Sequence, residues 1–245
     1  MAVLPPMPMP MPDPTLAAVD REMEARARRQ PRRDYLGFSS IGHPCSRKLQ
    51  YDLRATEQQS HDAATLKRFE DGHRGEALMA SRLRMVPGIR LWTVDPETAG
   101  QIGFSDFGGR FKGHADGVIQ GLIQAPETPH VWEHKATNER KQAKLAALKI
   151  ELGEKNALAA WDEVYHAQAI LYMHYANLTR HYLTCSTPGE RTTVSVRTNA
   201  DPEAALKLID KARRILDAKY PLARISNSPE WWQCKWCEHR EQCHV

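Results

Sequence analysis

Cysteine, aromatic residues and long hydrophobic runs are all scarce in this sequence. Of 245 residues, 5 are cysteine, and Phe, Trp and Tyr together make up 7%. Five cysteines are too few to act as a disulfide scaffold for a chain of this length. No apolar run reaches the roughly 18 residues that a membrane-spanning helix needs. We therefore expect neither a disulfide-rich fold nor a membrane partner.

A secretory signal is also missing from the first residues. The opening segment, MAVLPPMPMPMPDPTL, lacks the basic region followed by an apolar region that a signal peptide requires. Without secretion, clustered cysteines are typical of metal ligands in a reducing compartment. We therefore expect a cytoplasmic protein, either bacterial or from a phage-infected host cell.

Charge and hydrophobic content are those of a folded, mildly basic protein. Hydrophobic residues make up 41% of the chain, which is enough for a core, and the length suggests one large domain. The formal net charge is +4 and the pI is about 8.8. Such a balance is compatible with a phosphate-binding surface, although it does not demonstrate one.

The N-terminal part differs in composition from the rest. Residues 5–14 are almost entirely Met and Pro, which neither continue a helix nor pair in a sheet. Residues 15–33 are highly charged and are expected to form a short helix that Pro31 ends. We predict a disordered arm over residues 1–34, either solvated or touching DNA, and a single folded domain over residues 35–245.

Two helices are predicted early in that domain. Ser39 or Ser40 is expected to cap a short helix that carries Cys45. Apolar residues recur at helical spacing over 62–86, but Gly72 and Gly75 interrupt the pattern, so the main helix is expected to begin near them.

The remaining pattern alternates between strands and helices. Gly108-Gly109 is expected to form a hairpin turn between two strands. The order predicts a mixed α/β fold, with strands at 88–94, 101–107, 110–119 and 130–136, helices at 138–158 and 161–178, strands at 181–187 and 192–198, and a helix at 201–220.

Two acidic residues lie in consecutive predicted strands. Asp116 lies in RFKGHADGVI, and Glu133 lies in HVWEHKA together with Lys135. Because strand side chains alternate with period two, Glu133 and Lys135 should share one face while His134 points to the other. Solvated surface charge is the alternative interpretation of so short a motif.

This arrangement has the components of phosphodiester hydrolysis. Mg²⁺ prefers carboxylate oxygens and keeps several of its waters, and it lowers the pKa of a bound water. A lysine beside such a site can orient the attacking water or stabilise the developing negative charge. The backbone carbonyl of His134 is a further candidate metal ligand. Gly113 and Gly117 flank Asp116 and are expected to let a ligand approach the backbone.

The segment GHADGVI followed by WEHKA resembles the PD-(D/E)xK nuclease superfamily in its RecB-like branch. The resemblance implies a restriction-endonuclease-like core, in which helices flank a central mixed β-sheet. It further implies that Asp116 and Glu133 hold Mg²⁺ or Mn²⁺ and that Lys135 assists the water. Ala115 stands where the name of the superfamily has proline, which members of this branch often lack.

Two helical motifs extend the resemblance. In Gly72-His73-Arg74-Gly75-Glu76, the family pattern makes Glu76 a further metal ligand and His73 an alternative one. An ordinary surface glutamate is the other interpretation.

In HAQAILYMHY, Gln168 and Tyr172 match a Gln-x-x-x-Tyr motif that assists catalysis, and their spacing places them on one helix face. The alternative is a core tyrosine with a glutamine at its rim.

Four of the five cysteines form a pattern of their own. Three stand close together near the end of the chain and a fourth lies far upstream, which indicates a metal or iron–sulfur site joining both ends of the domain: Cys45, Cys234, Cys237 and Cys243. The pattern resembles the iron–sulfur RecB-like nucleases, namely the CRISPR-associated exonucleases and the AddB nuclease domain, and implies a [4Fe–4S] cluster.

Zinc is the alternative metal, held by four thiolates or by three thiolates and a histidine. In the latter case His239 or His244 would be the fourth ligand and Cys45 would be left out. Cys185 is predicted to be an ordinary buried residue.

The resemblance implies a Mg²⁺- or Mn²⁺-dependent DNA exonuclease, acting in recombination, repair or the processing of phage or mobile-element DNA. Its partners would be single-stranded DNA or duplex ends, with a possible homo-oligomer or with recombination or CRISPR proteins. The alternatives are a non-catalytic zinc or iron–sulfur DNA-binding module, and an endonuclease or CRISPR spacer-processing subunit of the same fold.

Overall fold

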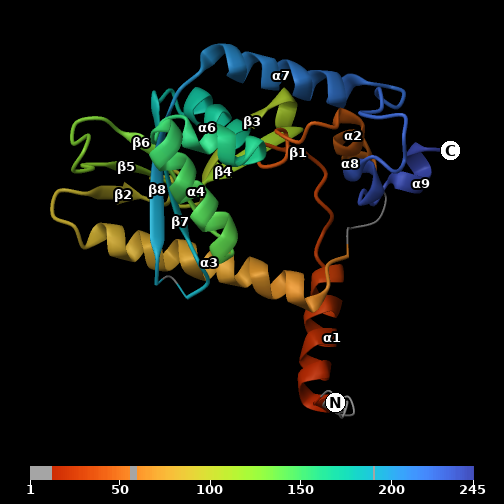
Figure 1. Cartoon of the computed structure of the whole chain (residues 1–245), viewed down its shortest axis with the longest axis horizontal. Helices are drawn as coiled ribbons and strands as arrows, with labels where there is room; N and C mark the ends of the chain where they lie inside the picture. Colours follow the sequence, from red (N-terminus) through yellow and green to blue (C-terminus); the bar gives the residue numbers. More distant parts are fainter. Residues whose placement is uncertain (1–12, 56–59, 190) are drawn as a thin grey trace, which may run out of the picture.

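The computed structural model describes residues 13–55, 60–189 and 191–245. Helices and short strands alternate along these residues (Figure 1). In chain order they are α1 (Pro14–Arg28), β1 (Leu36–Gly37), α2 (Ser46–Arg54), α3 (Ala63–Arg84), β2 (Arg90–Trp92), β3 (Ile102–Asp106), the 3₁₀ turn η1 (Phe107–Gly109), β4 (Phe111–Ala115), β5 (Gly117–Gln120), β6 (His130–Ala136), α4 (Glu139–Leu152), α5 (Ala157–Trp161), α6 (Glu163–Tyr175), β7 (Arg180–Ser186), β8 (Thr193–Asn199), α7 (Pro202–Asp217), α8 (Trp232–Lys235) and α9 (Arg240–Cys243).

The strands form two sheets. The larger has the order β2-β5-β6-β7-β8, in which β6 and β7 are parallel and the other pairs are antiparallel. The smaller has the order β1-β4-β3, with β1 parallel to β4 and β3 antiparallel to it. The expectation of a mixed α/β fold with helices around mixed sheets is therefore confirmed.

One predicted strand is in fact two. The run 110–119 bends at Asp116, so that β4 belongs to the small sheet and β5 to the large one. Apolar alternation continues through the bend, which is why the sequence pattern does not reveal it. The bend places Asp116 where the chain leaves one sheet and enters the other.

Helices cover both faces of the sheets (Figure 1). α3 packs beneath the large sheet through Met79 and Ala80, which meet Trp132 of β6 in one buried cluster. On the opposite face, α4, α5 and α6 bury side chains against β7 and β8. α6 also covers β1 and β4, and α7 lies over α6 in the same cluster, to which Phe38 and Tyr172 contribute.

Three helix predictions need correction. α3 runs unbroken from Ala63 to Arg84 through both glycines, because burial of its apolar side chains outweighs the cost of about 1 kcal/mol per helical glycine. The predicted helix 138–158 splits, since Gly153 has a φ of 78° after α4. α2 is capped by the Cys45 thiol, which accepts from the Lys48 amide, and not by either predicted serine.

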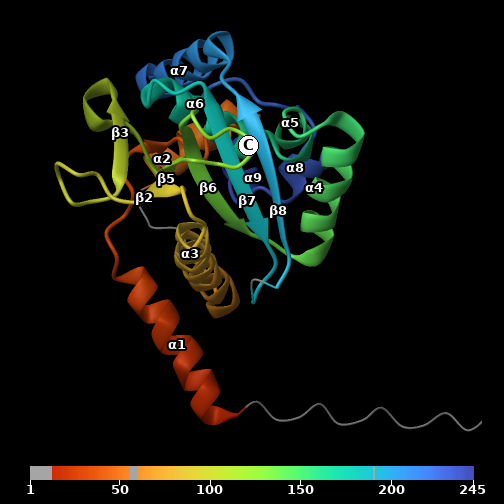
Figure 2. The same cartoon turned by 90° about the vertical axis from the view of Figure 1, so that its left-hand side faces the viewer.

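The N-terminal arm contains a helix. α1 projects from the body beside the end of α3 (Figure 2), and the two are joined by an ion pair of 2.5 Å between Lys67 and Asp20 and by a bond from the Ala63 amide to Glu24. α1 confirms the short charged helix expected within residues 15–33, and the prediction for residues 1–12 lies outside the described residues. No helix in the described ranges is long and apolar enough to cross a membrane.

Candidate active site

Asp116 and Glu133 lie side by side. The backbone amide of Asp116 donates to Oε1 of Glu133 at 3.2 Å, and Oδ2 of Asp116 accepts from the backbone amide of His134 at 2.8 Å. β5 stops pairing with β6 at Trp132, which leaves the edge of β6 beyond that residue to the Asp116 carboxylate. The bend therefore joins two predicted site residues.

Lys135 points to the same carboxylate. Its Nζ lies 2.7 Å from Oε2 of Glu133, whose side chain is 2% exposed. Burial and the charge of Asp116 raise the pKa of Glu133, while Lys135 opposes this rise. Burial works against the charge on Lys135, but Glu133 and Asp116 outweigh it and raise the pKa of that amine. The lysine is therefore held as an ammonium beside the acids.

Glu76 on α3 is the third acid near this pair. Burial raises its pKa to about 7, with a further rise from Asp116 and an opposing effect of Lys135. Carboxylates that perturb one another in a partly buried place mark a candidate functional site. His73 lies one turn earlier on α3 and is exposed. The structure thus favours Glu76 over His73 as the residue that faces the acidic pair.

The three acids do not crowd together. Among the described residues, one group of three possible metal-binding side chains has its ligand atoms all within 4.8 Å of one another: Asp52, Glu238 and His239. The oxygens of Glu76, Asp116 and Glu133 are therefore more widely spaced.

The His134 side chain points away from the acids, as the period of two predicts. Its two ring nitrogens lie 3.0 Å from Thr184 Oγ1 and 3.1 Å from Ser186 Oγ. These bonds fix the ring on β7. The part of His134 that meets the site is its backbone, through the amide that holds Asp116.

Gln168 and Tyr172 share a face of α6, but they lie beneath the site. Gln168 Nε2 donates to the Tyr172 hydroxyl at 3.1 Å, and this hydroxyl donates to the carbonyl of His114 at 2.6 Å. Both side chains are buried. Burial and the nearby Glu133 carboxylate raise the pKa of Tyr172, so its hydroxyl remains protonated. These contacts anchor the end of β4, two residues before Asp116.

Other parts of the protein fill the space beside the two glycines that flank Asp116, Gly113 and Gly117. A Cβ on Gly113 would lie 2.6 Å from the Phe38 ring, and one on Gly117 would lie 2.7 Å from the carbonyl of Trp92. The expectation that they admit a ligand is therefore wrong, because close packing of the protein itself requires them.

Sequence reasoning missed Tyr165, whose ring lies 5.2 Å from Nζ of Lys135 and 4.7 Å from Nζ of Lys141. Its position three residues before Gln168 on the same helix is a signal that could have identified it. The aromatic face adds a favourable contact for the lysine ammonium.

The four cysteines of the predicted metal or iron–sulfur site, which we call the clasp, line one cavity of about 250 Å³: Cys45, Cys234, Cys237 and Cys243. Burial, followed by the charges of the other three thiols, raises the pKa of Cys234. His244 also lines the cavity, and its Nε2 is buried without a hydrogen-bond partner in the described residues. Cys185 is fully buried in the core, as predicted.

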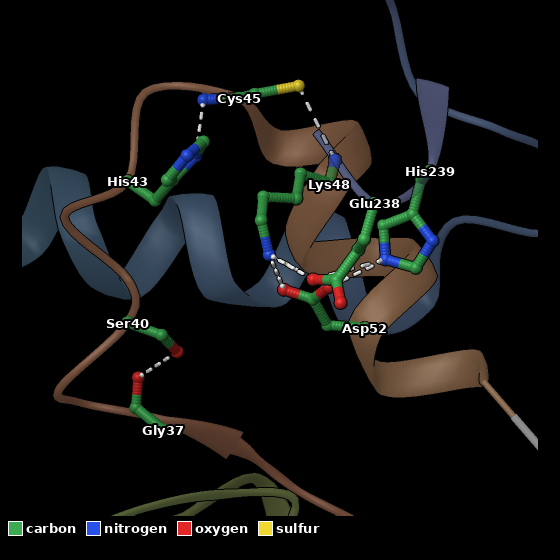
Figure 3. A network of polar contacts seen from close by, with 8 residues as sticks. All are labelled: Gly37, Ser40, His43, Cys45, Lys48, Asp52, Glu238 and His239. Carbon is green, nitrogen blue, oxygen red and sulfur yellow. Dashed lines mark hydrogen bonds and ion pairs between the residues drawn. The ribbon is translucent and has the colours of Figure 1, made fainter. Parts of the chain in front are cut away.

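A polar network holds the clasp together (Figure 3). Lys48 lies 2.8 Å from Asp52 and 3.1 Å from Glu238, and His239 Nε2 lies 2.7 Å from Asp52. The network joins α2 to the segment that carries the C-terminal cysteines. The Lys48 ammonium pairs with both carboxylates, and Asp52 also engages His239, one of the two alternative zinc ligands.

No protein-family model and no curated protein sequence matches the chain. Among solved structures, an alkaline exonuclease from Laribacter hongkongensis has a TM-score of 0.52 at 14% identity, covering 80% of this chain and 90% of that chain. The same exonuclease in complex with dAMP gives 0.52 at 15% identity over the same shares. A phage-related exonuclease from Haemophilus somnus 129PT gives 0.49 at 11% identity, covering 74% and 91%. The chain therefore has the fold of the Laribacter exonuclease.

Proposed function

We propose that this chain is a Mg²⁺- or Mn²⁺-dependent nuclease that removes nucleotides from DNA ends. The observation that carries the proposal is the convergence of Asp116, Glu133 and Lys135 at the bend between β4 and β5, with Glu76 facing them from α3. The shared fold with an exonuclease supports the reaction class. The structure of that exonuclease with dAMP supports DNA as the polymer.

The acids suit a hard divalent cation. The pKa values of Glu76 and Glu133 are raised partly because Asp116 adds negative charge. Among the described residues, Lys135 is the nearby cation that offsets this charge. Asp116 and Glu133 would hold the ion directly, together with the backbone carbonyl of His134. Mg²⁺ keeps several of its waters, so the more distant Glu76 can act through one of them. A bound ion would stabilise charge on the phosphate and lower the pKa of a water.

The protein's own groups would then position the reactants. Lys135 stays charged and lies at the acids, where it can orient the attacking water or stabilise negative charge on the phosphate. Tyr172 and Gln168 hold β4 in place through the His114 carbonyl. Their contribution is to the placement of Asp116 and not to contact with the reacting atoms.

The cysteine cavity suits an iron–sulfur cluster better than zinc. Four thiolates around one zinc ion, each at 2.3 Å, would lie about 3.8 Å apart. Cys45, Cys234, Cys237 and Cys243 share one cavity, yet no three of their sulfur atoms lie within 4.8 Å of one another in the described chain. A polynuclear cluster needs such a wider cage, and four thiolates complete its ligand set. Under the zinc alternative, His244 is the available histidine.

The test is a cleavage assay with end-labelled linear DNA and with circular DNA. We expect Mn²⁺ to support release of nucleotides from the linear substrate only, and EDTA to stop it. Asp116→Asn keeps an oxygen for the His134 amide but removes the charge, so it should abolish cleavage.

Asp95→Asn is the matched control, because the Asp95 carboxylate accepts bonds from the amides of Glu97 and Thr98 within its own exposed turn and an asparagine can accept the same bonds. Equal activity of Asp116→Asn and the wild type would refute the assignment. Cleavage of circular DNA would identify an endonuclease, and binding of DNA without any cleavage a non-catalytic module.

A further inference from the structure

The outward face of the small sheet leads directly to Asp116. Along β4, Phe111, Gly113 and Ala115 are buried toward α6, whereas Lys112 is partly exposed and His114 is exposed. The outward face is the one turned away from α6. At about 3.3 Å per residue, Lys112 lies roughly 13 Å along the chain from Asp116.

Small residues leave this face open. Across the ladders, Lys112 pairs with Gly37 of β1 and with Ser105 of β3, and His114 pairs with Gly103 of β3. No bulky neighbour on these strands covers the two basic side chains. The result is a shallow floor with the side chains of Lys112 and His114 on top.

Two cations share one aromatic ring at the far end of this floor. The guanidinium carbon of Arg33 lies 4.3 Å from the centre of the Tyr35 ring, and Nζ of Lys112 lies 5.0 Å from it. Neither cation has a carboxylate partner in the described ranges. The adjacent Asp34 is exposed and forms no ion pair there. By contrast, Lys141 on α4 is paired with Asp162. The two cations are thus held in place but not neutralised.

The guanidinium of Arg33 lies directly over Gly37. A Cβ on Gly37 would lie 1.7 Å from Nη2 and 2.4 Å from the guanidinium carbon of Arg33. The absence of a side chain at Gly37 therefore fixes where this cation lies. A positioned cation with no acidic partner indicates an anionic ligand.

We propose that Arg33, whose guanidinium lies over Gly37 of β1, and Lys112 and His114 of β4 bind the phosphate backbone of a single DNA strand and lead it to Asp116. The inference rests on the proposed function. Regularly spaced phosphates complement unpaired cations on an open floor, and the sheet continues into the candidate active site. The span from Lys112 to Asp116 covers a few nucleotides, so the bound phosphates belong to the strand that enters the site.

The test measures binding of labelled single-stranded DNA by fluorescence anisotropy in EDTA, over a series of salt concentrations. Arg33→Ala and Lys112→Ala should each weaken binding several-fold and equally for unrelated sequences. Each should also make the slope of log affinity against log salt shallower by about 0.7. Tyr35→Phe keeps the ring that seats both cations and should bind as the wild type does.

Gly37→Ala separates the position of Arg33 from its charge. The three atoms nearest to the added methyl all belong to the flexible end of Arg33, so the fold should persist while binding falls as it does in Arg33→Ala. Matched controls are Gly100→Ala, where the new Cβ meets nothing closer than 3.5 Å, and Lys207→Ala on α7, whose ammonium pairs with Glu203. Both controls should bind as the wild type does.

The outcomes distinguish this inference from the proposed function. Wild-type affinity and salt slope in Arg33→Ala and Lys112→Ala would overturn the proposed phosphate-binding track of Arg33, Lys112 and His114. EDTA-sensitive cleavage by the wild type would still support the proposed nuclease function. A wild type that binds through these residues but cleaves no DNA would keep the track and refute the nuclease. A wild type that binds no DNA overturns the track in any case.

Discussion

At the scale of single residues, Asp116 decides the geometry of the site. Its own amide holds one oxygen of Glu133, and its carboxylate accepts the amide of His134. The bend that allows both contacts has no special residue in the left-handed region, because Asp116 is not among the positions with positive φ. The carboxylate that would bind a metal ion thus also bonds to β6 at the point where the chain passes from the small sheet to the large one.

Lys135→Ala should reduce cleavage by about 10²–10⁴-fold, the range for loss of a positioned group that assists proton transfer or orients water. The reason is that Lys135 is held as an ammonium against Glu133. Initial rates with Mn²⁺ measure the effect, and circular dichroism checks the fold. Lys144→Ala, an exposed lysine on α4, should cleave at the wild-type rate. A wild-type rate in Lys135→Ala would contradict its role.

Glu76 should make metal-free stability depend on pH. Its pKa is about 7, above the ordinary 4.5, so between these values the folded protein binds a proton that the unfolded chain does not. The free energy of unfolding should therefore fall as pH rises through this window, by on the order of 1–2 kcal/mol. Glu76→Gln should flatten that fall in urea titrations at about pH 5 and about pH 8. An unchanged fall in Glu76→Gln would contradict the assignment.

The same ionisation has the opposite effect on metal binding. Only the ionised carboxylate is a ligand, so Mn²⁺ affinity should increase as pH rises through about 7. Calorimetric titration of Mn²⁺ on both sides of this pH measures the change. Affinity that is independent of pH would place Glu76 outside the metal site.

At the scale of elements, α2 connects the start of the domain to its end. Gln50 on α2 is fully buried, and its amide donates to the Tyr220 carbonyl at 2.8 Å and accepts from the Leu222 amide at 2.8 Å. Arg47 reaches the Leu222 carbonyl and lies 3.8 Å from the Cys243 thiol. α2 thus orders the segment that returns to the cysteine cavity.

Gln50→Ala should lower the free energy of unfolding by about 1–3 kcal/mol, because it removes two hydrogen bonds to part-buried backbone groups, at about 0.5–1.5 kcal/mol each. Urea unfolding followed by circular dichroism measures this. Gln124→Ala, at an exposed glutamine, should change stability little. Equal stability of the two variants would show that α2 does not anchor this segment.

At the scale of the whole molecule, the proposed cluster would connect parts of the chain about 190 residues apart, and closing so long a loop would restrict the unfolded chain strongly. The candidate active-site acids and the cysteine cavity are built from different elements, the former on β4 to β6 and α3, the latter on α2 and residues beyond α7. A clasp can therefore stabilise the fold without taking part in cleavage.

Protein purified without oxygen should contain iron and sulfide, and Cys45→Ser should lose the iron. The loss should lower the free energy of unfolding by about 3–5 kcal/mol, the value for cross-linking a loop of this length. Cys185→Ala is the control and should keep its iron, since Cys185 lies in the core away from the cavity. Zinc in place of iron, or iron retained in Cys45→Ser, would contradict the cluster.

Local patterns alone were enough to predict most elements. Alternation in HVWEHKA predicts both β6 and the shared face of Glu133 and Lys135, since strand side chains repeat every two residues. The same logic fails at Asp116, because a change of sheet depends on which strands lie on either side, and alternation does not record this. It also fails for α3, where burial against β6 offsets two glycines.

The sequence by itself determined which residue types are available for metal binding or catalysis: three acids, a lysine and four cysteines, three of them close together. Only the tertiary structure decided how they are grouped. It turned Gln168 and Tyr172 into supports for β4, filled the space at Gly113 with Phe38, and aligned Arg33 with Lys112 over Tyr35. The physical reason is that residue type fixes the charges and ligand atoms, whereas distances between remote segments follow from the packing of whole helices and sheets.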